Sequence, residues 1–149
     1  MFLPFYTKQN SRAFSKLILA HKPQARAMVK GSRSFPSLHG CVEFYPSEGG
    51  TLVAAEFYKL PRQEGACYAL QLHRGGRCSG TVEDPFSDAG EKLAAPAARD
   101  SRLLPCQGYV YQVFFTDQFV PNDVVGRTAV LHELAGSDTK MGCGVILRS

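Results

Sequence analysis

The chain has 149 residues, a length that suits one domain with a proper hydrophobic core. Hydrophobic residues make up 44% of the chain and charged residues 20%, which indicates a globular protein and argues against disorder. The net charge of +4 is mild and the basic residues are scattered, so no nucleic-acid-binding surface is indicated. No stretch is long and apolar enough for a membrane span or a signal peptide, so we expect a cytoplasmic protein.

Residues 1–22 carry no strand pattern, and we expect them to form a tail that precedes a single domain over residues 23–149. Strand signals dominate that domain, as short runs rich in β-branched and aromatic residues separated by Gly, Pro, Ser and Asn. Runs of this kind at this spacing predict an all-β sandwich or barrel. The predicted strands are 25–29, 38–45, 52–60, 66–73, 108–115, 124–133 and 142–147.

The segment 74–107 interrupts this rhythm, because it runs for more than 30 residues without a strand pattern. Loops longer than about 12–15 residues are usually functional or disordered. Within it, only the Ala-rich piece 88–99 suggests a helical turn, which is a weak signal. We therefore predict one long loop on an otherwise compact β domain.

The sequence has four histidines, and two of them stand out by position. His21 and His39 carry no recognisable pattern and are interpreted as structural or exposed. His73 and His132 each end a predicted strand. Residues two apart in a strand share a face, so Gln71 points the same way as His73. A histidine pair there would form a metal-binding edge, but an amide is a poor ligand for copper.

Five cysteines occur in the chain, and their spacing matches no zinc ribbon or CxxC redox motif. An odd count without a secretion signal is typical of reduced thiols. Composition alone therefore predicts no disulfide. The cysteines are Cys41, Cys67, Cys78, Cys106 and Cys143.

Several stretches, in their shared order, resemble the copper/zinc superoxide dismutases. They are GRTAVLHE at 126–133, CGVI at 143–146, ALQLHRGGRCSG at 69–80 and the opening run ARAMVKGSRSFPSLHG from residue 25. The pattern is most similar to a bacterial branch of the family, and the resemblance covers about residues 25–147. It implies a Greek-key β-sandwich or barrel of seven to eight strands, and it raises the possibility of a homodimer.

The resemblance also implies that most of the metal ligands are gone. The family's first copper histidine falls on Gln71, the second on His73 and the last on His132, while the histidine that bridges copper and zinc falls near Lys92. The remnant copper site is therefore His73 and His132, where at most low-affinity copper binding and no zinc binding is expected. The remaining zinc positions fall roughly on Pro96, Arg99 and Arg102.

The same resemblance places Lys140 at the arginine that guides superoxide, where lysine keeps the charge but loses the planar fork. It pairs Cys78 with Cys143 as the family's disulfide, and two free thiols are the other reading. The remaining cysteines are then expected to pack as small apolar side chains. We also expect His73 and His132 to converge on one shallow site, either to bind a metal or to hydrogen-bond each other or the backbone.

Two main interpretations of function follow. The first is a superoxide dismutase-like domain that has lost most metal ligands and is non-catalytic or very weakly active, as a partner-binding domain or as a degenerate product. The alternative is a functional copper-dependent enzyme that converts superoxide into hydrogen peroxide and dioxygen. Neither a nucleophile elbow nor a phosphate or dinucleotide fingerprint is present, so another enzyme class is not indicated.

Overall fold

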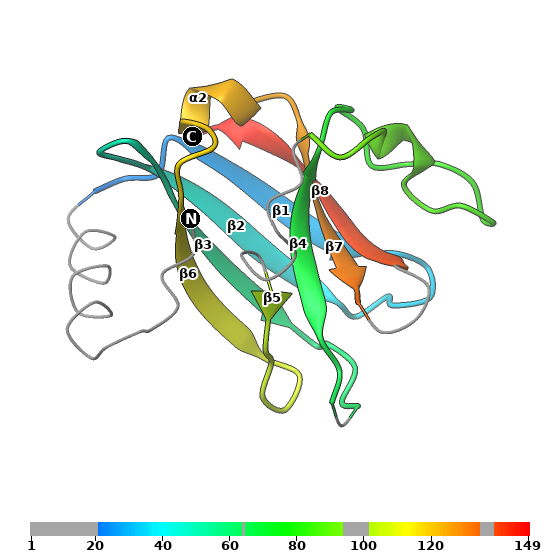
Figure 1. Cartoon of the computed structure of the whole chain (residues 1–149). Coiled ribbons are helices and arrows are strands. Elements are labelled where there is room, and N and C mark those ends of the chain that lie inside the picture. The colour runs from blue at the N-terminus through cyan, green and yellow to red at the C-terminus, as the bar shows by residue number, and fades with distance from the viewer. Residues whose placement is uncertain (1–20, 64, 94–101, 135–138) are drawn as a thin grey trace.

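The computed structural model describes residues 21–63, 65–93, 102–134 and 139–149 (Figure 1). Most of the predicted tail at 1–22 lies outside these residues. Eight strands, one 3-10 helix and one short α-helix are found in the described part of the chain. They are β1 (Ala25–Gly31), β2 (His39–Ser47), β3 (Gly50–Tyr58), β4 (Tyr68–His73), η1 (Ser87–Ala89), β5 (Arg102–Leu103), β6 (Val110–Thr116), α2 (Pro121–Val124), β7 (Thr128–Glu133) and β8 (Lys140–Arg148).

The strands form one antiparallel sheet in the order β5-β4-β7-β8-β1-β2-β3-β6. The sheet curls round so that its two end strands approach each other (Figure 1). There, Nε2 of Gln112 on β6 donates to the carbonyl of Arg102 on β5 at 2.6 Å, which makes the barrel nearly closed. The β3–β4 and β6–β7 connections join strands that are not neighbours, as Greek-key connections do. The predicted all-β barrel is therefore confirmed.

The core lies inside the curled sheet, where alternate residues of each strand meet. In β1, for example, Ala25, Ala27 and Val29 are buried while the residues between them face outwards. Large side chains such as Phe44 and Tyr68 fill the interior, and burying one of this size stabilises the fold by about 1.5–3 kcal/mol. No helix in the described ranges is long and apolar enough to cross a membrane.

The segment that follows β4 covers part of the barrel's outer surface. Phe86 and Ala89 pack with Val130 of β7 and Cys143 of β8 in a second, smaller apolar cluster, and Cys78 packs against it. The first five residues of β7 are consequently buried in succession, because the core covers one face of the strand and this segment covers the other. We call residues 74–93 the covering loop.

Two predicted boundaries were wrong. The segment 74–107 is not free of strands, since β5 lies within it and pairs Leu103 with Tyr68; two residues are too few to leave an alternating pattern. The strand predicted from residue 124 begins only at Thr128, because Pro121 to Val124 form a helical turn. Proline is favoured at the first position of a helix, where its missing N–H costs no hydrogen bond.

Candidate functional site

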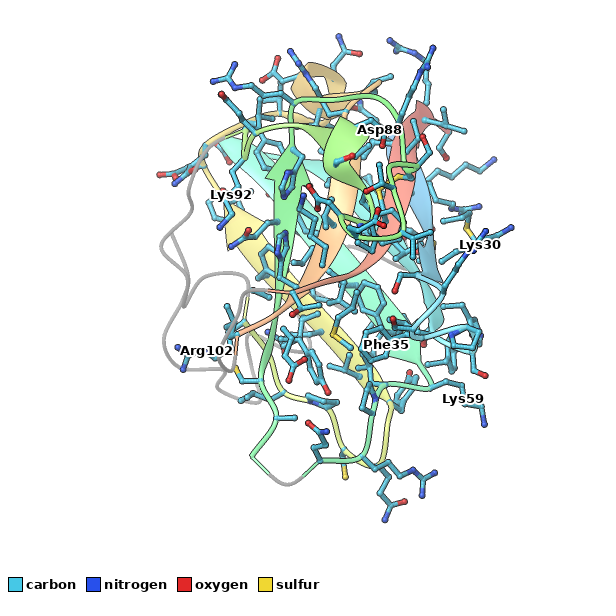
Figure 2. The ribbon with its side chains drawn as sticks, turned by 90° about the vertical axis from the view of Figure 1, so that its right-hand side faces the viewer. Lys30, Phe35, Lys59, Asp88, Lys92 and Arg102 are labelled. Carbon is cyan, nitrogen blue, oxygen red and sulfur yellow. A yellow bond between two sulfur atoms is a disulfide. The ribbon has the colours of Figure 1, made fainter. Side chains whose placement is uncertain are left out.

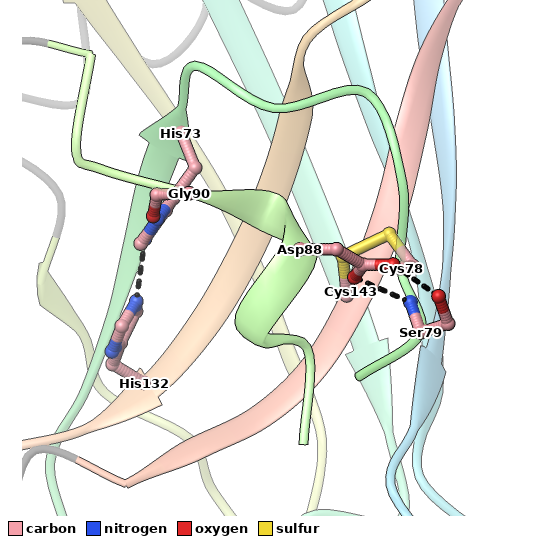
Figure 3. Close-up of a disulfide and its surroundings, with 7 residues drawn as sticks. All are labelled: His73, Cys78, Ser79, Asp88, Gly90, His132 and Cys143. Carbon is pink, nitrogen blue, oxygen red and sulfur yellow. Dashed lines mark hydrogen bonds between the residues drawn. A yellow bond between two sulfur atoms is a disulfide. The ribbon is translucent and has the colours of Figure 1, made fainter. Parts of the chain in front are cut away.

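His73 ends β4 and His132 lies on β7, and their side chains meet on the outer face of the sheet beneath the covering loop (Figure 3). Their Nε2 atoms lie 3.0 Å apart and their ring planes are inclined by only 11°. Nδ1 of His73 also lies 2.7 Å from the carbonyl oxygen of Gly90 in the covering loop. The structure thus brings the two predicted histidines together. The site is not shallow as expected, since both side chains are almost fully buried.

When both rings are neutral, the hydrogen-bond partners of His73 assign the tautomers of the pair. A carbonyl oxygen only accepts hydrogen bonds, so Nδ1 of His73 carries a proton and donates it to Gly90. In the neutral ring, Nε2 of His73 is then an acceptor, and the donor in the 3.0 Å contact is Nε2–H of His132. The hydrogen bond between the imidazoles places a proton between two nitrogens that the resemblance assigns to copper.

Gln71 lies on the outer face of β4, two residues before His73, as predicted. It is buried, and its Oε1 forms no hydrogen bond with any described residue. Oγ1 of Thr128, which is opposite His73 in the β4–β7 register, is likewise buried without a hydrogen-bond partner in the described part of the chain. Neutral oxygens of this kind suit water or a hard cation better than copper.

Of the positions that the resemblance assigns to the bridging and zinc ligands, the structure describes Lys92 and Arg102, and both carry cationic side chains. The backbone of Lys92 pairs with that of His73, but the Lys92 side chain is exposed at the surface (Figure 2). Arg102 is exposed on β5, where it pairs with Ala69. Pro96 and Arg99 lie outside the described residues. An ammonium and a guanidinium are cations and repel a metal ion.

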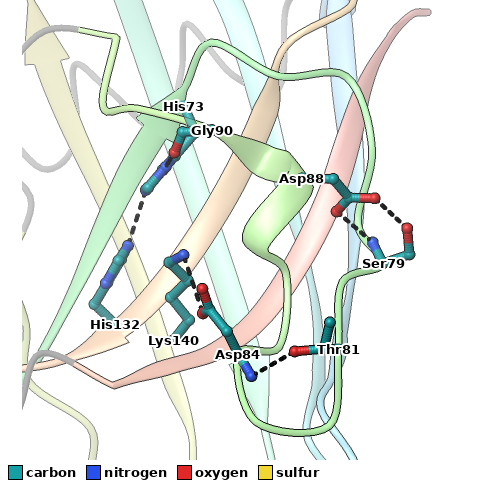
Figure 4. A network of polar contacts seen from close by, with 8 residues as sticks. All are labelled: His73, Ser79, Thr81, Asp84, Asp88, Gly90, His132 and Lys140. Atoms are coloured by element: carbon teal, nitrogen blue, oxygen red, sulfur yellow. Dashed lines mark hydrogen bonds and ion pairs between the residues drawn. The ribbon is translucent and has the colours of Figure 1, made fainter.

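Lys140 lies opposite His132 in the β7–β8 register. Its Nζ is 3.7 Å from Oδ1 of Asp84 in the covering loop (Figure 4). The backbone N–H of Asp84 in turn donates to Oγ1 of Thr81 at 2.9 Å. The ammonium at the anion-guiding position therefore has a carboxylate beside it, which reduces its attraction for an incoming anion.

Cys78 and Cys143 form a disulfide with their Cα atoms 5.6 Å apart (Figure 3). The pairing implied by the resemblance is confirmed, and the expectation from composition that all five thiols are reduced was wrong. The bond joins the covering loop to β8. Among the other cysteines, Cys41 and Cys67 are half-buried, and burial is the main cause that raises the pKa of the Cys41 thiol. Cys106 is exposed and is not packed as expected.

A polar clamp that sequence reasoning missed closes the covering loop on itself. The backbone N–H of Ser79 donates to Oδ1 of Asp88 at 2.8 Å, and the Ser79 hydroxyl donates to Oδ2 of the same carboxylate (Figure 4). These hydrogen bonds, the hydroxyl first, hold the pKa of Asp88 below its ordinary value. Gly75 permits the tight path, because a Cβ there would lie 2.3 Å from the Asp88 carbonyl oxygen.

The other two histidines lie away from this site. His39 is exposed, its Nδ1 donates to the carbonyl of Ser37 at 2.9 Å, and its ring stacks on Tyr58. His21 is exposed. Both agree with the structural or exposed role predicted for them.

The donor set does not fit the family's metals. No group of three or more His, Cys, Asp or Glu side chains able to hold a metal ion occurs among residues 21–63, 65–93, 102–134 and 139–149. Two imidazoles that already share a hydrogen bond provide half of a four-nitrogen copper site. Sequence comparison adds no identification, because neither a protein-family model nor a curated protein matches this chain.

Proposed function

We propose that this chain is a superoxide dismutase-like domain that no longer catalyses dismutation, and that a hydrogen bond between His73 and His132 stands where the family holds copper. The observation that carries the proposal is the 3.0 Å contact between the two Nε2 atoms, with Gly90 accepting from the far side of His73. The two Nε2 atoms that would bind copper are hydrogen-bonded to each other, so copper binding would first have to break this hydrogen bond.

The surroundings support the same conclusion. Dismutation needs a metal that changes oxidation state in a fixed ligand geometry with an open position for superoxide. Gln71 offers a neutral amide where an imidazole is needed, and Lys92 brings a cation near the bridging position. Both histidines are buried, and the Lys140 ammonium faces Asp84. Each of these features disfavours either the binding of copper or the approach of superoxide.

One observation favours the alternative, a working copper enzyme. A metal-binding imidazole commonly donates its other ring N–H to a backbone carbonyl, and His73 does so to Gly90. Removal of the bridging proton would leave Nε2 of both rings available to a metal. Two imidazoles alone would hold copper loosely, and loosely held copper exchanges with other chelators. We therefore keep this alternative as the outcome that would overturn the proposal.

The test is metal analysis and a superoxide assay on full-length protein that has been loaded with copper and zinc and then washed with EDTA. We expect less than about 0.1 copper per chain and no dismutation above that of unloaded protein. A Gln71→His variant should gain little activity, because the bridging ligand is still missing. Chelator-resistant activity that scales with protein concentration and disappears in His132→Ala would overturn the proposal.

Three further expectations from the sequence belong with this proposal. A cytoplasmic location, a homodimer and a bacterial origin stay predictions. The Cys78–Cys143 disulfide argues against the cytoplasmic location, because disulfides persist mainly in oxidising compartments. Locating the protein in its cell, together with the redox state of this pair, would test that expectation.

A further inference from the structure

A group of aromatic side chains lies on the outer surface of β2, β3 and β6, in the half of the sheet that does not carry His73 and His132. Tyr58, Tyr109 and Tyr111 are 39%, 42% and 51% exposed. His39 stacks on Tyr58 with ring centroids 5.1 Å apart, and the rings of Tyr58 and Tyr109 are 5.2 Å apart. We call these four residues and Glu56 the tyrosine face.

Glu56 is the centre of this face. The hydroxyl of Tyr109 donates to its Oε2 at 2.6 Å, and Tyr111 is its direct neighbour across the β3–β6 pair. Hydrogen bonding to Glu56 is the first cause that raises the pKa of Tyr109 to about 12, and it also raises the pKa of Tyr58. The hydroxyl of Tyr109 thus stays protonated and points its proton at the Glu56 carboxylate.

Within the described part of the chain, this carboxylate differs from its neighbour Glu43 in forming no ion pair. Glu43 forms an ion pair with Arg26 at 2.7 Å, and Lys140 pairs with Asp84. Neither of these ion pairs between described residues involves Glu56. On a protein of net charge +4, the Glu56 carboxylate therefore accepts from a neutral phenol hydroxyl and takes part in no ion pair with another described residue.

We propose that the tyrosine face is a docking surface for a protein partner that presents an arginine side chain to Glu56. A guanidinium matches a carboxylate through two parallel hydrogen bonds, and its plane stacks on aromatic rings better than an ammonium does. The set spans three adjacent strands, a breadth that suits a protein segment. Tyrosine and arginine are also the residues that most often dominate the energetics of protein interfaces.

The face is preorganised for such a contact. The His39–Tyr58–Tyr109 contacts and the Tyr109–Glu56 hydrogen bond restrict these side chains before any partner arrives. Less side-chain freedom is then lost on binding, which favours affinity. The proposal does not depend on the His73–His132 site, since a dismutase and a non-catalytic domain would carry the same surface.

The test uses the full chain and a fluorescein-labelled octa-arginine peptide, with binding followed by anisotropy at physiological salt. Glu56→Gln should weaken binding about tenfold and Tyr111→Ser about threefold, in line with the loss of a charged hydrogen bond and of one ring contact. Glu83→Gln is the matched control, because it removes the same charge from an exposed position in the covering loop. An octa-lysine peptide should bind more weakly than octa-arginine.

Three results would overturn the proposal. The first is equal binding by Glu56→Gln and the unchanged protein. The second is an equal loss in Glu83→Gln, which would mean that the peptide responds to overall charge alone. The third is no binding of octa-arginine below about 1 mM, the weak limit for a specific contact. Unchanged thermal unfolding of each variant would show that the comparison concerns the surface and not the fold.

Discussion

His73 and His132 touch through their Nε2 atoms at 3.0 Å, although His73 lies opposite Thr128, four residues before His132, in the β4–β7 register. The two side chains therefore lean toward each other along the strands, past the row of Gln71 and Val130. Gly90 of the covering loop accepts from Nδ1 of His73 and so helps to hold this ring in the orientation that the contact needs.

We predict that His132→Ala lowers the free energy of unfolding by about 1–3 kcal/mol, because it leaves His73 buried without its imidazole partner. The loss should be the same in urea titrations with EDTA and with added copper, since the contact needs no metal. His39→Ala, which removes an exposed ring stacked on Tyr58, should cost less, about 0.5–1 kcal/mol. If the unchanged protein were more stable with added copper than with EDTA, the result would contradict this prediction.

The disulfide supports a second prediction. Cys78 and Cys143 are 65 residues apart in sequence, so breaking their bond frees a long loop in the unfolded chain. The double variant C78S/C143S should lose up to about 4 kcal/mol of stability in the chain-entropy model. Cys106→Ser, at an exposed free thiol, is the control and should be neutral. Equal unfolding midpoints for the two variants in denaturant would contradict the predicted role.

Asp88 should make the covering loop sensitive to acid. Its folded-state pKa lies below the ordinary value of 3.8, mainly because the Ser79 hydroxyl donates to the carboxylate. A lowered pKa contributes stability that is present above the unfolded pKa and is lost as pH falls through the folded one. Asp88→Asn should therefore be less stable than wild type at pH 6, and the difference should shrink below about pH 4. A difference in melting temperature that is the same at both pH values would contradict this.

Tyr109 should titrate unusually late. Its pKa is raised to about 12, first by the hydrogen bond to Glu56. This contribution to stability is present below the ordinary value of 10 and is lost as pH rises toward 12. Ultraviolet titration should show a late step from two tyrosines, because burial, as the first cause, also raises the pKa of Tyr45 to about 12. The Tyr109 part of that step should be lost in Tyr109→Phe and should move to lower pH in Glu56→Gln, while the Tyr45 part stays. Ionisation of all six tyrosines near pH 10 would contradict the hydrogen bond between Tyr109 and Glu56.

Much of the fold could be predicted from the sequence because the strands alternate. In β1, apolar residues that face the core alternate with residues that face outwards, and β3 shows the same period of two near its end. Turn residues separate these runs from the next ones. β5 could not be found in this way. Its two residues are held in place by pairing with Tyr68 and Ala69, and by contact with Gln112 at the other end of the sheet.

The candidate site, like the fold, was only partly predictable from the sequence. The sequence determined that His73 and His132 lie at or next to the ends of strands, that Gln71 shares a face with His73, and that few metal-binding side chains remain. Only the tertiary structure decided that the two imidazoles bind each other, that Gly90 accepts from one of them, and that Asp84 and Asp88 fix the covering loop. The reason is physical: local alternation records which face of a strand a residue occupies. The partners of His73 are 17 residues away in sequence at Gly90 and 59 residues away at His132. The path of the covering loop brings the first to His73, and the register of the barrel brings the second.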